Sequence, residues 1–369
     1  MMNGKHVIKL CMTVVCIWAI AVTGALAKEK PEVVWPHSSV NAVSNQEATL
    51  VDASVLQAVS NAVNDKLHDL EKENKLPFTL KESDTGLTED IAQNASVALI
   101  PLVMDDHCYK SSYVIKGHSF YKAVVMTLID VAFCYYPGSG NSLRIMHVIP
   151  LAGYSVIGSN GEFTSPISKT ELQNQFVQNA TQLIQENLSF KNKRFLKDID
   201  LKMVTPDTYQ VTDVTVSSKA AQRFYGPRLS LVKSLIASAF TSEYAASHDD
   251  VTVLPSIVSG KWQEDAAKKT YQLSLGDTGK YIVMERANNE IALDLQKIAA
   301  FDIPIKHDAG VYKQKGYAAA VRNKTDNVLG TAEVQRTVLP ETNPNQVKYD
   351  VTGILAEILT DAAKDAAKK

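Results

Sequence analysis

Residues 121–158 (YKAVVMTLIDVAFCYYPGSGNSLRIMHVIPLAGYSVIG) decide the fold that the sequence predicts. Two apolar runs, rich in β-branched and aromatic residues, flank the short polar cluster at 137–141, which contains Gly138 and Gly140. This arrangement is typical of a long β-hairpin with a glycine-containing loop. The stretch therefore predicts the centre of a β-sheet, in which the aromatic residues are core and the glycines form a turn.

Four segments with amphipathic periodicity predict helices: 54–74, 169–188, 229–244 and 351–367. Their apolar residues recur at intervals of three and four positions, which places them on one face of an α-helix. Asp52 or Ser54 is expected to cap the first helix, and Ser168 with Glu171 is expected to form a capping box before the second. The last helix ends in a lysine-rich tail that we expect to be solvated.

Short apolar runs outside the hairpin predict strands at 97–103, 209–216, 251–255, 271–275, 280–286, 290–305, 316–323 and 328–337. The runs VALIP at 97–101 and VTVLP at 251–255 share a valine, two aliphatic residues and a proline, and each follows a predicted helix. The order of elements is therefore similar in the two halves of the chain. This similarity favours two domains of similar plan.

The resulting prediction is an α+β fold with layers of helices and strands. Each domain is expected to hold an antiparallel-rich mixed sheet, with a long hairpin packed against helices at its two ends. The predicted division of the chain is a signal peptide at 1–27, an extended lead-in at 28–50, a first domain at 51–190, a connection with an extra strand at 191–227, and a second domain at 228–369.

This order of elements, together with the strand that ends in proline, resembles the small α/β domains of exported envelope-assembly factors. Examples are the curli-secretion lipoproteins and the N-terminal domain of the Tol-system propeller protein. The resemblance implies a role in the cell envelope by analogy of fold, and no site residue is carried over from it.

The first 27 residues have the three parts of a secretory signal peptide. Lys5 and Lys9 are basic, residues 10–22 are apolar, and 25–27 (ALA) forms a small-residue cleavage site. The mature protein is therefore expected in the periplasm or outside the cell. The alternative is an uncleaved anchor, because the apolar run approaches the ~20 residues that cross a bilayer. The protein would be membrane-associated only in that case.

The balance of charge gives no electrostatic signature for nucleic acid. The chain has 38 basic and 40 acidic residues, and loss of residues 1–27 removes two lysines, leaving 36 against 40, or −4. A basic cluster follows the second predicted helix, and we interpret it as a solvated linker: Lys191, Lys193, Arg194 and Lys197. The predicted partner is therefore a protein or another envelope component, with no nucleic acid and no cofactor.

The mature chain keeps two cysteines, Cys108 and Cys134. In an oxidising compartment such a pair is often bridged, and a closed loop of about 25 residues would stabilise the fold by roughly 3–4 kcal/mol. The competing interpretation is two free thiols, because Cys134 lies in an apolar strand where a buried cysteine is ordinary.

The segment 105–118 carries the most reactive side chains of the sequence. Asp105, Asp106, His107 and His118 are weak candidates for a metal site, since carboxylate and imidazole are ligands of transition metals. Their spacing matches no standard zinc pattern, and adjacent side chains of a strand point to opposite faces. We therefore expect a polar loop after the strand at 97–103, with a metal site as the alternative.

Other signatures of catalysis are absent from the sequence. Ser155 lies in GYSVIG, which has one residue too many for a nucleophile elbow, and the glycines at 138 and 140 lack a third glycine for a phosphate loop. Asp130 would need a partner such as Arg144 or His147. The leading prediction is thus a non-enzymatic, exported envelope protein that acts by binding or assembly. The alternative is an envelope hydrolase or metal-binding protein with its site at 105–118.

Overall fold

The computed structural model describes residues 30–37, 40–43, 50–83, 97–115, 117–135, 142–158, 161–201, 203, 207–275, 280–303, 313–338 and 344–369. The predicted signal peptide and the predicted hairpin loop at 137–141 lie outside the described residues. Within them the chain forms two mixed β-sheets and six α-helices, so the predicted α+β class is confirmed.

The first sheet has ten strands: β1 (Glu32–Pro36), β2 (Asn41–Ala42), β3 (Thr79–Ser83), β4 (Val97–Asp105), β5 (Cys108–Ile115), β6 (His118–Tyr135), β7 (Ser142–Ile157), β10 (Gln263–Asp265), β11 (Thr270–Ser274) and β12 (Tyr281–Glu285). Its order is β10-β11-β12-β7-β6-β4-β1-β3, with β2 beside β4 and β5 beside β6. The predicted hairpin is the antiparallel pair β6–β7, whose register runs from Ala123↔Ile157 to Tyr135↔Arg144.

The second sheet has five strands: β8 (Thr208–Val216), β9 (Thr252–Val253), β13 (Asn289–Ile303), β14 (Lys313–Asn323) and β15 (Val328–Val338). Its order is β15-β14-β13-β8-β9. The described helices are α2 (Ala53–Lys72), α4 (Lys169–Asn187), α5 (Lys193–Leu201), α6 (Lys219–Tyr225), α7 (Leu229–Ser247) and α8 (Pro344–Lys368).

The predicted caps form where expected. Asp52, and not Ser54, caps α2, because its Oδ1 accepts hydrogen bonds from the backbone N–H of Ser54 (3.0 Å) and Val55 (3.1 Å). Ser168 and Glu171 make the complete capping box of α4. These contacts satisfy backbone donors that the first helical turn leaves unpaired.

The two sheets repeat one topology. In the first sheet, β1 lies parallel between β3 and β4, and β4, β6 and β7 follow as an antiparallel series. In the second sheet, β8 lies parallel between β9 and β13, and β13, β14 and β15 follow as an antiparallel series. Helices stand at matching places: α2 between β1 and β3, α7 between β8 and β9, and α4 and α8 after the hairpins.

The repeat begins earlier than the sequence suggested. The segment 28–50, expected as an extended lead-in, contributes β1, and the strand expected at 209–216 is β8, the first strand of the second sheet. The strands at 97–101 and 251–255 are not equivalent, because β4 is paired on both sides while β9 is a two-residue edge strand that corresponds to β3. The domain boundaries stay a prediction.

Strands β10–β12 have no counterpart among the described residues of the first half of the chain. They follow β9 in sequence, yet they join the first sheet, because β12 pairs in parallel with β7 at Tyr281↔Ser142. This insertion links the second half of the chain to the first sheet through backbone hydrogen bonds.

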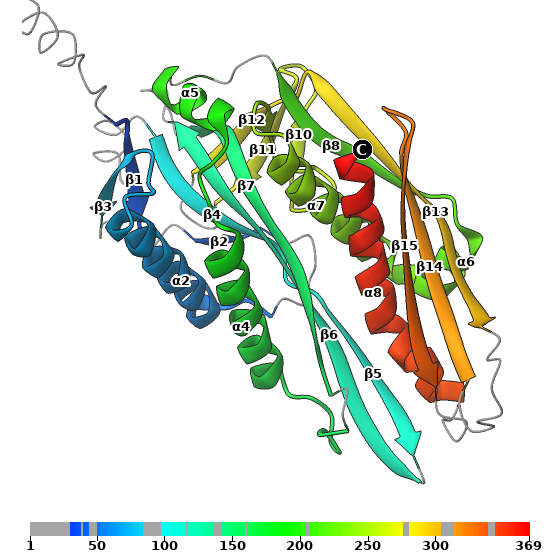
Figure 1. The fold of residues 1–369 in the computed structure, drawn as a ribbon. Helices are drawn as coiled ribbons and strands as arrows, with labels where there is room; N and C mark the ends of the chain where they lie inside the picture. Colours follow the sequence, from blue (N-terminus) through cyan, green and yellow to red (C-terminus); the bar gives the residue numbers. More distant parts are fainter. Residues whose placement is uncertain are drawn as a thin grey trace, which may run out of the picture.

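The molecule has four layers (Figure 1). Helices α2 and α4 cover one face of the first sheet, α7 and α8 lie between the two sheets, and the second sheet is the last layer. The core between the sheets combines Val124 and Met126 of β6 with Leu235 of α7, Leu359 of α8 and Tyr317 of β14. The helices of the second repeat therefore fill the space between both sheets.

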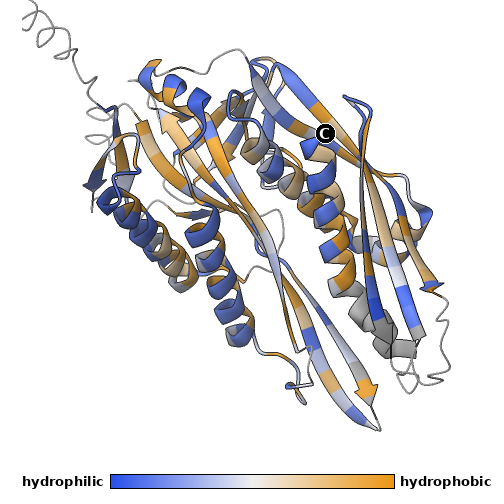
Figure 2. Cartoon of the chain, viewed as in Figure 1, coloured by the Kyte–Doolittle hydropathy of each residue, from blue (hydrophilic) through white to orange (hydrophobic). Residues whose placement is uncertain are grey.

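Helix α7 was expected to be amphipathic, and this prediction is wrong. Ten of its residues, from Leu231 to Thr241, are buried, because the helix is covered by a sheet on each side. By contrast, α2 and α4 cover the outside of the molecule and are largely hydrophilic in Figure 2. The predicted helix at 229–244 does form, but its buried residues are spread around it, which is typical of a helix in an inner layer.

The prediction of a polar loop after the strand at 97–103 is also wrong. Strand β5 lies there, and β4 and β5 follow one another along β6, with Asp105 opposite Leu128 and Cys108 opposite Val125. They form one long strand that is interrupted at Asp106 and His107, just after a register shift between Val103 and Asp105. This interruption is where the candidate metal ligands lie.

Candidate functional site

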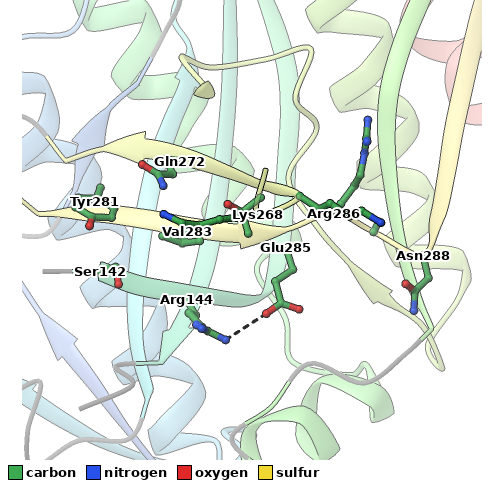
Figure 3. A pocket seen from close by; sticks show the side chains of 12 residues that line it. Ser142, Arg144, Lys268, Gln272, Tyr281, Val283, Glu285, Arg286 and Asn288 are labelled. Carbon is green, nitrogen blue, oxygen red and sulfur yellow. Dashed lines mark hydrogen bonds and ion pairs between the residues drawn. The ribbon is translucent and has the colours of Figure 1, made fainter. Parts of the chain in front are cut away.

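An open cleft of about 690 Å³ lies on the first sheet. Figure 3 shows its lining side chains, which come from the start of β7, from β11 and β12, and from the links beside them. The lining residues of the three strands are neighbours in the sheet, with Arg144 opposite Val283 and Val283 opposite Gln272, so they share one face of it. A volume of this size is within the ~300–1,000 Å³ range of small-ligand sites.

Four cationic side chains line the cleft, against one carboxylate: Arg144, Lys268, Lys269 and Arg286 against Glu285. The remaining lining is polar or small except for Val283 and the ring of Tyr281, which is 37% exposed. Such a lining offers many hydrogen-bond donors and contains none of the catalytic groupings sought in the sequence.

Ion pairs hold most of these cations in place. Arg144 Nη1 lies 3.2 Å from Glu285 Oε1, and Arg286 Nε lies 2.7 Å from Glu290 Oε1. Lys268 pairs with Asp265 just outside the cleft at 3.2 Å. These contacts are solvent-exposed and individually weak, so a ligand anion can compete for the cations.

Lys269 differs from the other three. Its side chain is exposed and makes no ion pair or hydrogen bond with any residue of the described ranges. Its backbone has a positive φ of 54°, and its carbonyl accepts a hydrogen bond of 3.2 Å from the backbone N–H of Arg286. The turn between β10 and β11 therefore presents one unneutralised cation to the cleft.

A second candidate site is the interruption between β4 and β5. One ligand atom from each of Asp105, Asp106 and His107 lies within 4.8 Å of the other two. The side chain of Asp105 is 4% exposed, and that of His107 is 22% exposed, with His107 Nδ1 3.3 Å from Asp105 Oδ1. The structure thus brings together three of the four candidate metal ligands.

The fourth candidate, His118, is not part of this group. His118 begins β6 and pairs with Ile115 at the tip of the β5–β6 hairpin, whereas Met126 of β6 donates a hydrogen bond of 2.8 Å to the carbonyl of His107. Eight positions of a strand separate 118 from 126, or about 26 Å. A site that contains all four residues is therefore excluded.

The predicted disulfide is wrong. Both cysteines are free, and Cys108 lies opposite Val125, nine positions along β6 from Cys134. That separation is about 30 Å, whereas a disulfide needs Cα atoms within about 7 Å. Burial raises the pKa of both thiols, which makes them poor nucleophiles.

Asp130 has neither of its suggested partners. It lies opposite Leu102 and Pro150, while His147 lies opposite Phe133 and Arg144 opposite Tyr135. Two of the four residues of the basic cluster after α4 are paired: Lys193 lies 2.9 Å from Asp249, and Arg194 contacts Asp207. Neither feature forms a site.

No family model matches this chain, and no curated protein matches it. One solved structure, of a homolog of neuraminyllactose-binding hemagglutinin from Helicobacter pylori, is similar with 11% sequence identity and a TM-score of 0.30. The match covers 48% of this chain and 93% of that one. A similarity of this size supports no inference about fold or function.

No helix in the described ranges has both the length and the apolar character that a crossing of the bilayer requires.

Proposed function

We propose that this protein is an exported, non-enzymatic protein of the cell envelope, and that it acts by binding an anionic ligand in the cleft between β7, β11 and β12. The ligand is a molecule or polymer that carries carboxylate or phosphate groups. The observation that carries the proposal is the lining of the cleft, with four cations against one carboxylate.

The position of the cleft supports this role. Its lining combines the insertion β10–β12 with the start of β7, which are paired in the first sheet. The Arg144–Glu285 ion pair joins residues of β7 and β12, as drawn in Figure 3. The site is therefore set on the face of a continuous sheet.

Binding is tested by isothermal titration of the mature chain with short-chain polyphosphate and with oligogalacturonate, which separate phosphate from carboxylate ligands. We expect one of the two to bind, with an affinity that falls as salt concentration rises. Lys269→Glu should weaken this binding about tenfold, because it replaces a cation that has no ion-pair partner among the described residues with an anion.

A matched control makes the same change of charge far from the cleft. Lys72 lies on α2, where its side chain is 77% exposed. Lys72→Glu should leave the affinity unchanged. Absence of binding by both ligands, or an equal loss in both variants, would contradict the proposal.

Export is tested by N-terminal sequencing of the protein recovered from the envelope or the medium. The cleavage site at 25–27 predicts a mature chain that begins at Lys28. Ala27→Asp should block processing and leave the unprocessed chain with the membrane. Recovery of the full-length chain in the soluble fraction would show that the segment is not a signal peptide.

A further inference from the structure

Three buried polar atoms in the interrupted strand β4–β5 have no hydrogen-bond partner among the described residues: Asp105 Oδ1, Asp106 Oδ1 and His107 Nδ1. Asp105 and Asp106 are 3% and 0% exposed as whole residues. Asp105 Oδ1 and His107 Nδ1 lie 3.3 Å apart without the geometry of a hydrogen bond. Buried carboxylate oxygens that lack hydrogen bonds are costly, and here two carboxylates are adjacent. Their arrangement therefore calls for a cation.

The backbone explains how consecutive side chains converge. In a regular strand, Asp106 would point away from Asp105 and His107. Here the ladder with β6 shifts by one residue after Val103, and residues 106–107 leave the regular strand conformation. Strand β2 pairs with β4 only as far as Val103. Beyond this point no described strand pairs with the chain on the side away from β6, and Asp105, Asp106 and His107 lie there.

A hydrogen bond to Oδ2 holds the side chain of Asp106 in position. Its Oδ2 accepts a hydrogen bond of 2.9 Å from the backbone N–H of Val51, in the segment before α2. This contact leaves Oδ1 for another partner. A bound cation of charge +2 would balance the charges of the two carboxylates together.

We propose that Asp105, Asp106 and His107 bind one divalent transition-metal cation of the zinc type. Two carboxylate oxygens and one imidazole nitrogen are a donor set that suits Zn²⁺, while Ca²⁺ and Mg²⁺ prefer oxygen alone. The 3.3 Å between Asp105 Oδ1 and His107 Nδ1 matches two ligands of one ion with bonds of about 2.0–2.1 Å. His107 is partly exposed and gives the ion a path from solvent, and water completes its coordination.

The site would connect two parts of the fold. Through Asp106 and Val51 it joins the β4–β5 interruption to the start of α2, and it is independent of the cleft at β12. The bound ion is therefore expected to stabilise the first sheet and its outer helices.

The test uses the mature chain stripped with EDTA and titrated with Zn²⁺ in competition with a chromophoric chelator. We expect one equivalent of bound zinc in the wild type. Asp105→Asn and His107→Gln should each lower the affinity at least tenfold. His118→Gln is the matched control, because His118 is exposed at the hairpin tip, and it should bind as the wild type does.

A thermal measurement separates loss of a ligand from loss of the fold. Without metal, Asp105→Asn should melt at or above the temperature of the wild type, because it removes a buried charge. Added Zn²⁺ should raise the melting temperature of the wild type and of His118→Gln, but not that of Asp105→Asn. X-ray absorption of the zinc-loaded wild type should show oxygen and nitrogen ligands.

Three results would overturn the proposal. The first is no zinc bound by the wild type, and the second is unchanged binding in Asp105→Asn and His107→Gln. The third is a sulfur ligand in the absorption spectrum, because Cys108 is the nearest thiol in sequence and is not in the proposed donor set. Each result leaves the anion-binding proposal untouched, since that test uses other residues.

Discussion

Asp130 is a carboxylate enclosed by the hairpin and β4, without a described partner. Burial raises its pKa from 3.8 to about 7. A raised pKa in the folded state means that the folded protein prefers the protonated acid. The stability that this proton provides is present at low pH and is lost as the pH rises from about 4 to about 7.

Asp130→Asn should therefore stabilise the protein at pH 8, by on the order of a few kcal/mol, and have little effect near pH 3. The asparagine side chain has a similar shape and carries no charge at either pH. Urea unfolding at the two pH values measures the difference. An equal effect at both would show that packing, and not ionisation, dominates at this position.

His147 gives the opposite pH dependence. Burial lowers its pKa to about 3, its Nδ1 has no hydrogen-bond partner among the described residues, and its ring lies 5.2 Å from that of Phe195. The neutral imidazole is therefore the folded form. The stability that depends on it is present above about pH 6.5 and is lost as the pH falls toward 3.

His147→Asn should lessen the loss of stability between pH 6.5 and pH 4, because asparagine takes up no proton there. Melting curves of wild type and variant across this range test the prediction. The variant is expected to lose some packing against Phe195 at every pH. The quantity compared is therefore the slope of the melting temperature against pH. Parallel slopes would rule out His147 as a source of acid sensitivity.

At the scale of single elements, the contact between β15 and α8 is unusually close. A Cβ atom on Gly330 would meet the carbonyl oxygen of Ala362 at 2.1 Å and the backbone nitrogen of Ala366 at 2.3 Å. Glycine is required there because both obstacles are backbone atoms, which cannot turn aside. This contact sets how near α8 approaches the second sheet.

Gly330→Ala should therefore destabilise the protein by roughly 1–3 kcal/mol through overpacking. Gly153→Ala is the control, because its Cβ would meet the end of the Leu183 side chain at 2.9 Å, and a side chain can rotate away. Chemical denaturation of the two variants measures the contrast. A smaller effect at Gly330 than at Gly153 would contradict the close packing.

At the scale of the whole molecule, helices α7 and α8 pack against both sheets. They pack on Val124 and Met126 of the first sheet and on Leu293 and Tyr317 of the second. Loss of either sheet would expose their apolar surface, so the two sheets are expected to unfold together.

Cooperative unfolding can be measured with Trp35, which is fully buried in β1 and donates a hydrogen bond of 3.1 Å to Asn64. In a mature chain with Trp262→Phe, its fluorescence reports the first repeat alone. We expect its midpoint in urea to coincide with that of far-ultraviolet circular dichroism, which reports both repeats. Two separate midpoints would show that the halves unfold independently.

The sequence by itself determined the local elements of this protein. Periodicity placed the hairpin β6–β7, the helix α2 and the capping box of α4, because these depend on residues close together in the chain. It also singled out Asp105, Asp106 and His107. It could not show that they converge, since that depends on the shift of one residue along β6.

The tertiary structure alone decided which sheet each strand joins. The sequence did not indicate the cleft, because its lining residues, at 142–144 and 268–288, are distant in sequence. They are brought together by the pairing of β12 with β7. The free cysteines follow from the register of β5 on β6, and the burial of α7 follows from the second sheet that covers it. Hydrophobic burial is non-directional, so an apolar pattern fixes a face but not the partner that covers it.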